Sequence, residues 1–264
     1  MLDIKSIREN FDGIKKAIES RGQGDYGIDQ VLRLDEQRRS LLGDVEAKKN
    51  RQNADSREIP KLKKEGKDTK NLLAEMKLLS EDIKKLDNQV NETEVALRSA
   101  LLNIPNTPDP RVPIGSSDQD NKEVRKWGEP RTFDFEQKAH WDVGTDLGIL
   151  DFERATKIAG TRFTVYKGPG ARLERSVMNF MLNLHTEQHG YTEILPPFMV
   201  NRDAMTGTGQ LPKFEEDMFH VPAKDFFLIP TAEVPVTNLH MNEILNAEEL
   251  PLYYPAYTPC FRKE

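Results

Sequence analysis

Two short polar clusters, each directly after an apolar run, contain residue types that could bind a charged small molecule. Thr231, Ala232 and Glu233 follow the run FFLIP, and Arg262 and Glu264 close the chain after YPAYTPCF. A carboxylate just beyond a buried strand can hold an ammonium group, and a guanidinium on a strand suits bidentate contact with a phosphate. On these residues alone, a structural salt bridge is the commoner explanation of each cluster.

A glycine-containing segment lies between the apolar runs of the same half of the chain. It comprises Thr206, Gly207, Thr208, Gly209 and Gln210. The segment begins like a phosphate-binding fingerprint, but neither a third glycine nor Gly-Lys-Ser/Thr follows. A dinucleotide fold and a P-loop are therefore unsupported, and we expect a mobile loop.

Metal and nucleophile signatures are incomplete. His185 and His189 stand four residues apart and could share a metal ion, yet the His-Glu-x-x-His order is absent. Packing at a helix end is the alternative. Cys260 is the only cysteine, which excludes an internal disulfide and a cysteine-based zinc site, and its context is not that of a nucleophile.

Residues 48–70 are the most basic stretch, with nine Lys or Arg residues against four Asp or Glu residues and a net charge of +5. A polyanion could bind there. A solvated helical surface is the alternative. The candidate contacts are Lys48, Lys49, Arg51, Arg57, Lys61, Lys63, Lys64 and Lys67.

Heptad patterns flank the basic stretch and predict the elements that position it. The first runs Val31, Leu34, Arg38, Leu41, Val45, Lys48 and Gln52, and the second runs Leu72, Met76, Leu79, Ile83, Leu86, Val90, Thr93 and Leu97. Residues 31–64 and 68–101 are equal in length and predict an antiparallel hairpin of roughly 50 Å with the basic run at its tip. Gly66 is the predicted helix terminator and Asp68 the following N-cap. Heptads do not show whether the partner strand is in the same chain, so a dimerising coiled coil is the alternative.

The remaining pattern predicts two domains joined by a linker. A short amphipathic helix with Asp3 as N-cap spans the apolar positions from Ile4 to Ile18. Four prolines between residues 105 and 113 then end the helical region. We predict a helical domain at 1–103, a proline-rich linker at 104–125 and a second domain at 126–264.

The second domain mixes helical and strand patterns and is predicted to be α+β, with an antiparallel sheet and helical layers. Helices are expected around residues 135–147 and 171–189. Strands are expected at residues 162–167, 191–195, 226–229 and 252–257.

Composition excludes several classes of protein. Charged residues make up 31% of the 264 residues, and the mean hydropathy is −0.67. No apolar run approaches the length of a membrane helix, and the start MLDIKSIREN has charges where a signal peptide needs an apolar stretch. We expect a soluble, cytoplasmic protein without a membrane partner.

The order of motifs resembles that of the bacterial seryl-tRNA synthetases, which are class II aminoacyl-tRNA synthetases, over nearly the whole chain. The start MLDIKSIREN, the helical hairpin, the linker RVPIGSSDQDNKEVRKWGEPR, the loop TGTGQLPKF, the triplet at 231–233 and the ending PCFRKE occur in that family's order. A helix followed by HGYTEILPPFM is similar to class II motif 1, with Pro197 as the motif proline. Phe261 to Glu264 is similar to the opening of motif 2.

The resemblance implies ATP-dependent activation of L-serine to seryl-adenylate and transfer to tRNA(Ser), in the family also to tRNA(Sec). It assigns Thr231, Ala232 and Glu233 to serine, and Arg262, Lys263 and Glu264 to ATP, with Arg262 on the α-phosphate. Residues 206–210 resemble a loop that closes near the active site, and the helical hairpin resembles the arm that grips the tRNA.

By the same resemblance, the chain ends inside motif 2 and its catalytic domain is incomplete. The Mg²⁺ ligands are expected beyond Glu264, none within this chain, and no zinc is implied. A homodimer is implied through motif 1, and the 264 residues alone are expected to be inactive. A synthetase-like tRNA-binding or regulatory protein without catalytic activity is the alternative, and a structural coiled-coil protein is a third.

Overall fold

The computed structural model describes residues 1–22 and 24–263. It divides into two compact units, Met1–Arg125 and Lys126–Glu264. The α+β class predicted from the sequence is confirmed: a long helical arm is followed by small antiparallel sheets. None of the described helices combines the length and the apolar character that a membrane span requires.

The N-terminal segment forms two short helices, α1 (Ile4–Glu9) and α2 (Phe11–Glu19), where the sequence predicted one. The chain leaves helical geometry at Asn10, whose φ of −138° ends α1 and precedes α2. The apolar spacing runs on through Asn10, so periodicity alone could not show the break. Asp3 caps α1 as predicted, because its side chain accepts a hydrogen bond from the Lys5 N–H.

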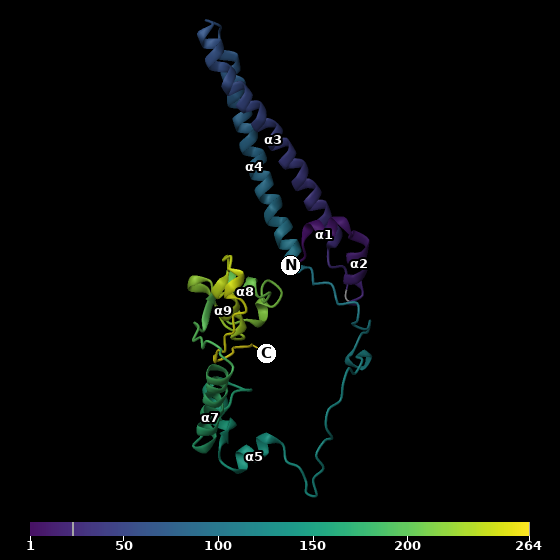
Figure 1. Ribbon diagram of the computed structural model, residues 1–264, viewed down its shortest axis with the longest axis vertical. Coiled ribbons are helices and arrows are strands. Elements are labelled where there is room, and N and C mark those ends of the chain that lie inside the picture. The colour runs from purple at the N-terminus through teal and green to yellow at the C-terminus, as the bar shows by residue number, and fades with distance from the viewer. Residues whose placement is uncertain (23, 264) are drawn as a thin grey trace. The chain divides into compact units, whose positions relative to one another are not determined.

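The arm is a hairpin of two long helices, α3 (Ile28–Lys64) and α4 (Lys70–Asn103), which run side by side (Figure 1). The partner strand is therefore in the same chain. Gly66 has a φ of +71°, which confirms it in the left-handed geometry of a terminator. Asp68 is not the N-cap of α4: Thr69 holds that position, and Asp68 accepts from the Lys70 N–H at 2.9 Å.

The seam between α3 and α4 follows the predicted heptads. Ile83, Val90, Thr93 and Leu97 of α4 are buried against α3. Farther along the arm the contacts become polar, and Gln52 donates to the Ser80 hydroxyl at 2.8 Å. At the base the seam joins the core cluster of the first unit, whose buried members are Ile7, Ile18, Ile28, Val31, Leu97, Leu101 and Ile104.

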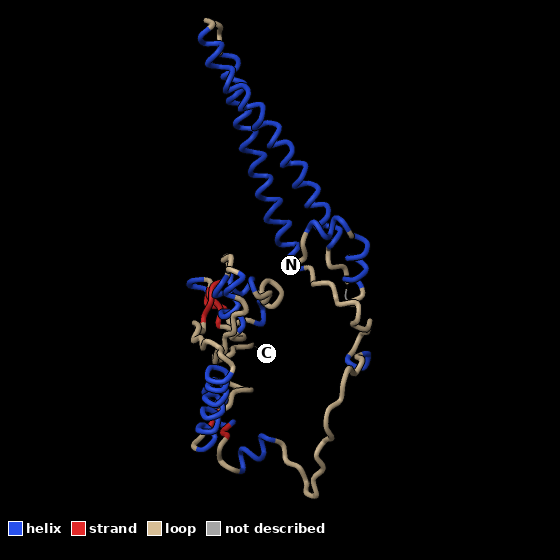
Figure 2. The backbone as a smooth tube through the Cα atoms, viewed as in Figure 1, coloured by secondary structure: helices blue, strands red, loops and turns tan. Residues whose placement is uncertain are grey.

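Residues 104–139 contain one short 3-10 turn, Asp118–Asp120, and otherwise run as loop (Figure 2). The next helix, α5 (His140–Asp146), begins later than the predicted start near residue 135. Strands β1 (Leu150–Asp151) and β2 (Val165–Tyr166) then pair antiparallel around α6 (Phe152–Ala159). The predicted helix at 171–189 is α7 (Pro169–Asn183), which passes into a π-helical turn at Leu184–Gln188.

A three-stranded antiparallel sheet in the order β3-β5-β4 supports the last part of the chain. Its strands are β3 (Met199–Asn201), β4 (His220–Val221) and β5 (Phe226–Leu228). The predicted strands at 191–195 and 252–257 are wrong among the described residues. These stretches are extended and share two backbone hydrogen bonds, Thr192 N–H to Tyr253 O and Ile194 N–H to Pro255 O, both 3.0 Å.

Candidate functional site

The central strand β5 positions the first polar cluster. Phe227 and Ile229 are fully buried, and Pro230 is buried next to them. Burial of a phenylalanine side chain of this kind stabilises a fold by roughly 3 kcal/mol. The end of β5 is thus firmly held, and it presents half-buried Thr231 just before helix α9 (Glu233–Thr237) begins.

The second polar cluster lies beside this strand end. The Phe261 N–H donates to the Ile229 carbonyl at 2.9 Å, and the Lys263 N–H donates to the Asp217 carbonyl at 3.2 Å. Arg262 lies between these two hydrogen bonds. Lys263 is held further by its ammonium, which donates to the Glu216 carbonyl at 3.0 Å. Segments far apart in the sequence therefore hold residues 261–263 in place.

A cavity of about 240 Å³ opens where these segments meet. It is lined by Gln210, Phe214, Asp217, Met218, Pro230, Thr231 and Arg262. Three residues selected from the sequence, Gln210, Thr231 and Arg262, thus face one cavity. Its size suits an amino acid better than a whole nucleotide. A hydroxyl, an amide and a guanidinium provide the donors that a carboxylate or a phosphate requires.

Other selected residues lie beside the cavity and do not line it. Ala232 is half-buried, and Glu233 is exposed in the first turn of α9, where its N–H donates to the Thr231 hydroxyl at 3.4 Å. Exposure leaves the Glu233 carboxylate accessible to a ligand. Glu264 lies outside the described residues.

Only part of the segment at 206–210 is the loop that the sequence predicted: residues 208–210 lie outside any helix, and the first two residues are helical. Thr206 and Gly207 end helix α8 (Arg202–Gly207), Thr208 is its C-cap, and Gly209 follows with a φ of +77°. Asn238 fastens α8 to α9, because its side-chain amide donates to the Ala204 carbonyl at 2.9 Å and to the Val234 carbonyl at 2.8 Å. A Cβ at Gly207 would overlap the Asn238 side chain. Gly207 is therefore needed for close packing, a role that the glycine pattern alone does not indicate.

The remaining selected positions of the second unit lie elsewhere. Pro197 is exposed, next to buried Pro196 and ahead of β3. The Nδ1 atoms of His185 and His189 are 3.1 Å apart, and the His185 ring lies 5.1 Å from that of Tyr191. Within residues 1–22 and 24–263, no group of three or more His, Cys, Asp or Glu side chains could hold a metal ion.

The eight selected cations of the arm divide into two sets. Four are engaged in ion pairs: Lys48 with Asp82 at 2.9 Å, Lys49 with Asp87 at 3.0 Å, Arg51 with Glu75 at 3.2 Å and Lys67 with Glu65 at 2.8 Å. The first three pairs join α3 to α4, and the Lys48 ammonium lowers the pKa of Asp82.

The other four, which we call the tip cations, are Arg57, Lys61, Lys63 and Lys64. All are exposed, and in the described part of the chain none forms an ion pair. Three of the paired cations thus link the two helices of the hairpin, whereas the tip cations keep their charge available for a partner.

Comparison with known proteins identifies relatives of both units of the chain. A family model described as the seryl-tRNA synthetase N-terminal domain matches residues 1–108, and one described as the tRNA synthetase class II core domain (G, H, P, S and T) matches residues 216–264. Over all 264 residues the chain is 64% identical to the serine–tRNA ligase of Alkaliphilus oremlandii. The chain belongs to the seryl-tRNA synthetase family. The resemblance found in the sequence is confirmed.

Relatives in this family are longer than the chain. The chain spans 62% of the length of the Alkaliphilus oremlandii ligase and 62% of that of Clostridium tetani, to which it is 58% identical. A crystal structure of seryl-tRNA synthetase from Pyrococcus horikoshii, complexed with ATP, matches with a TM-score of 0.89 and 33% identity. That match covers 100% of this chain and 64% of the other.

Four cavity residues were not singled out from the sequence: Phe214, Asp217, Met218 and Pro230. Asp217 follows Glu215 and Glu216 in an acidic run, and such a run is normally solvated surface. Pro230 adjoins the selected triplet, and a rule that extends each polar cluster to its neighbours would have found it. Phe214 is the last residue of the loop TGTGQLPKF, so extending the selected segment 206–210 to the end of that loop would have found it. The sequence carries no comparable signal for Met218.

An ion-pair cluster centred on Arg202 holds the chain that follows α8, because it joins the start of α8 to Glu215 and Asp225. Arg202 donates to Asp225 at 2.8 and 3.0 Å and to Glu215 at 2.7 Å, and its guanidinium lies 5.1 Å from the centre of the Phe227 ring. Hydrogen bonds from Arg202, and next from His220, lower the pKa of Asp225 from its ordinary 3.8 to about 2. Arg202 likewise lowers the pKa of Glu215.

The stabilising effect of this cluster should depend on pH. A carboxyl group whose pKa is lowered by folding stabilises the folded state above its unfolded pKa, and that contribution disappears as the pH falls through the folded pKa. For Asp225 the contribution should be complete above about pH 4 and should disappear toward pH 2. Melting temperatures of the wild type and of Asp225→Asn should therefore differ at pH 6 and converge toward pH 2. A difference that stays constant over this range would show that Asp225 has no such role.

Proposed function

We propose that the chain carries the tRNA-binding arm and the first part of the active site of a serine–tRNA ligase. The observation that carries the proposal is the cavity that Gln210, Thr231 and Arg262 line together. The proposal includes the roles of the site residues, ATP and Mg²⁺ as cofactors, and a location in the cytoplasm. The proposed partners are L-serine, tRNA and a second copy of the chain. The alternative function, a synthetase-like tRNA-binding or regulatory protein without catalytic activity, would not explain why these three polar side chains line one cavity.

Two reactions follow from this proposal. A carboxylate oxygen of L-serine attacks the α-phosphate of ATP, a P–O bond forms, and pyrophosphate leaves with the electrons of the bond that breaks. The 3′-terminal hydroxyl of tRNA(Ser), or of tRNA(Sec), then attacks the seryl carbonyl and AMP leaves. Charge grows on the α-phosphate in the first reaction, so a guanidinium placed there stabilises the transition state.

The residues present fit a division of these tasks. Thr231 offers a hydroxyl inside the cavity, and exposed Glu233 offers a carboxylate beside it to the serine ammonium. Ala232 lies between them, beside the cavity. Arg262 takes the α-phosphate, Lys263 holds the segment that carries it, and Glu264 is a further proposed contact to ATP. Helix α8 is fastened to α9 through Asn238, and the segment 206–210 at its end closes one side of the cavity through Gln210.

The experiment that tests the proposal is serine-dependent exchange of pyrophosphate into ATP, measured on the whole protein with and without Glu233→Ala. The wild type should exchange. The variant should raise the KM for serine about tenfold or more, because a charge-assisted hydrogen bond is removed, and should leave the KM for ATP within about twofold. No exchange by the wild type would reject the proposed activity, and an unchanged KM for serine in a folded variant would reject the role of Glu233.

A second prediction concerns the tip cations. Reversing the charge of Lys61, Lys63 and Lys64 to Glu should weaken binding of tRNA and flatten the plot of log affinity against log salt concentration. The slope should fall by about one unit for each phosphate that the arm no longer neutralises. Binding titrations at several salt concentrations measure it.

The matched control reverses three exposed lysines outside the arm, Lys5, Lys16 and Lys157, which changes the net charge by the same amount. Its slope should stay close to that of the wild type. Equal slopes for both variants would show that the tip is a solvated surface without tRNA contacts.

A homodimer is the remaining partner that we propose. Helix α7 exposes Leu173, Val177, Phe180 and Met181 at helical spacing, so that one side of the helix is apolar. These residues and exposed Pro197 belong to the stretch that resembles motif 1. A second copy of the chain would cover that apolar side.

A further inference from the structure

One carboxylate of the first unit is buried where α1 meets the base of the arm. Asp35 of α3 is 1% exposed, and within residues 1–22 and 24–125 no other ionisable residue is buried. Its Oδ2 atom pairs with the Arg8 Nε of α1 at 3.2 Å and with the Arg39 Nε at 3.1 Å, whereas its Oδ1 atom is buried without a hydrogen-bond partner. A carboxylate with one unsatisfied oxygen is a costly way to fill a core position.

Stability alone does not explain this arrangement. An apolar residue at position 35 would extend the core cluster that includes Ile7 and Val31 one turn below. Buried ion pairs are often replaced by apolar residues without loss of stability, and their best-attested benefit is a defined geometry. Apolar contacts alone constrain orientation weakly, because dispersion and burial do not depend on direction. The Arg8 guanidinium approaches the Asp35 carboxylate from α1, and Arg39, on the same helix as Asp35, holds that carboxylate in its orientation.

The orientation of the arm at its base matters because the arm is long, so that a small change of angle at the base moves the tip far. From Asp35 to the end of α3 at Lys64 the helix extends for about 44 Å, so a tilt of about 10° at the base would move the tip by about 8 Å. A phosphate contact tolerates a displacement of less than about 1 Å. The base of the arm must therefore be held more precisely than apolar packing alone would hold it.

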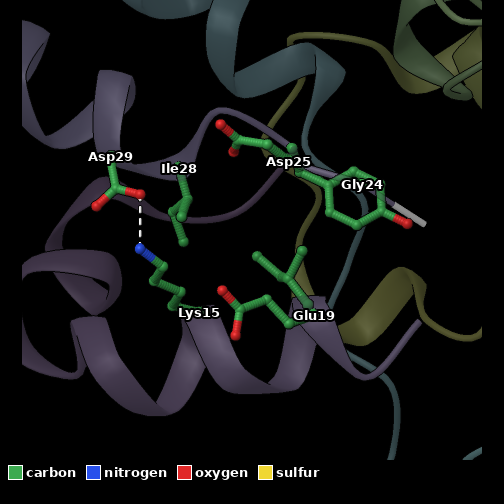
Figure 3. Close-up of a pocket in the computed structure, with 8 residues that line it drawn as sticks. Lys15, Glu19, Gly24, Asp25, Ile28 and Asp29 are labelled. Carbon is green, nitrogen blue, oxygen red and sulfur yellow. Dashed lines mark hydrogen bonds and ion pairs between the residues drawn. The ribbon is translucent and has the colours of Figure 1, made fainter. Parts of the chain in front are cut away.

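The next link lies one turn along α3. Arg38 pairs with Glu94 of α4 at 2.8 Å. The Arg8–Asp35 pair therefore joins α1 to α3, and the Arg38–Glu94 pair joins α3 to α4 one helical turn farther along. Figure 3 shows the ion pair between Lys15 of α2 and Asp29 of α3, at 2.7 Å. This pair differs from that of Asp35 because both of its side chains are substantially exposed. It adjoins a cavity of about 290 Å³ whose Asp25 carboxylate already accepts from the Gly27 N–H. That exposed pair serves as a natural control.

We infer that Asp35 is a positioning residue: through Arg8 and Arg39 it fixes the angle at which the arm leaves α1, and so places the tip cations for tRNA. The tRNA part of this inference rests on the proposed function. The angle itself does not, and it can be measured separately.

The experiment measures the angle and the activity on the same variants. Spin labels at Lys5→Cys in α1 and Glu58→Cys in α3, in a Cys260→Ser background, give the distribution of distances between α1 and the outer part of the arm. Asp35→Asn should broaden that distribution. In the unlabelled whole protein, Asp35→Asn should raise the KM for tRNA in aminoacylation about tenfold and leave pyrophosphate exchange within about twofold.

A second variant protects the test from a simple failure to fold. Arg8→Met, Asp35→Leu and Arg39→Met together remove the charges and keep the side-chain volume, so the helical circular dichroism signal should persist while the distance distribution broadens. Lys15→Met, the control, should change neither the distances nor the KM for tRNA.

The experiment tests the angle of the arm, its link to tRNA and the proposed function separately. An unchanged distance distribution in either folded Asp35 variant would overturn the inference, and a broadened distribution with an unchanged KM for tRNA would overturn the link to tRNA. Wild-type protein that cannot charge tRNA would instead reject the proposed function, and the distances would still decide the role of Asp35 in the angle.

Discussion

Arg262→Ala should slow serine-dependent pyrophosphate exchange by about 100- to 1000-fold in the whole protein, which corresponds to roughly 2.7–4 kcal/mol of transition-state stabilisation. Arg262 lines the cavity with Thr231, and backbone hydrogen bonds of Phe261 and Lys263 hold it there. Alanine at this position keeps those backbone bonds and removes the side chain beyond Cβ, including the guanidinium. The effect should therefore appear in the rate and not in the fold, and Arg262→Lys should recover only part of the rate, because an ammonium cannot make the bidentate contact.

The control for this experiment is Lys224→Ala, which removes an exposed cation outside the cavity and should exchange at the wild-type rate. Melting temperatures of both variants verify the fold. Near-normal exchange by folded Arg262→Ala would remove Arg262 from the mechanism.

Deletion of residues 40–89, with a short glycine-rich loop joining Arg39 to Val90, should abolish charging of tRNA and spare pyrophosphate exchange. The cut removes both partners of each outer ion pair, Lys48 with Asp82 and Arg51 with Glu75, so no charge is left without its partner there. The pair of Arg38 and Glu94 and the core cluster at the base stay in place. The truncated first unit should therefore fold.

Aminoacylation and exchange assays on the same preparation measure the two activities. The matched control is a variant that keeps the whole arm and carries Lys61, Lys63 and Lys64 as Glu. That control should charge tRNA weakly, whereas the deletion should not charge it at all. Normal charging by the deletion variant would show that the arm has no part in tRNA recognition.

The arm could be predicted from the sequence almost completely. Each contact along the seam joins residues on two regular helices, and a periodic pattern such as Leu79, Ile83, Leu86 and Val90 follows directly from helix geometry. Two features of the first unit could not be predicted from the periodic pattern, because each depends on a single residue. The break at Asn10 does not interrupt the apolar period, and buried Asp35 looks like an ordinary surface position between Leu34 and Arg38.

The cavity could be predicted only in part. Thr231 and Arg262 carry recognisable chemistry after apolar runs, but Phe214 and Met218 reach the same cavity through a bend of the chain that no local pattern specifies. The strands there are two or three residues long, too short for alternation to show. The stretches 191–195 and 252–257 have strand-like composition and still pair by only two hydrogen bonds, because β propensity depends on the neighbours that a strand meets.

The separate core of the first unit has a consequence for the order of events during protein synthesis. Residues 1–125 contain every member of the cluster around Val31 and both helices of the arm, so they need nothing from later residues in order to fold. A ribosome that adds about 5 to 20 residues per second needs roughly 7 to 28 s to complete the second unit, whereas helical hairpins with local contacts fold within about a millisecond. The nascent chain therefore carries a finished arm well before Thr231 and Arg262 have been synthesised.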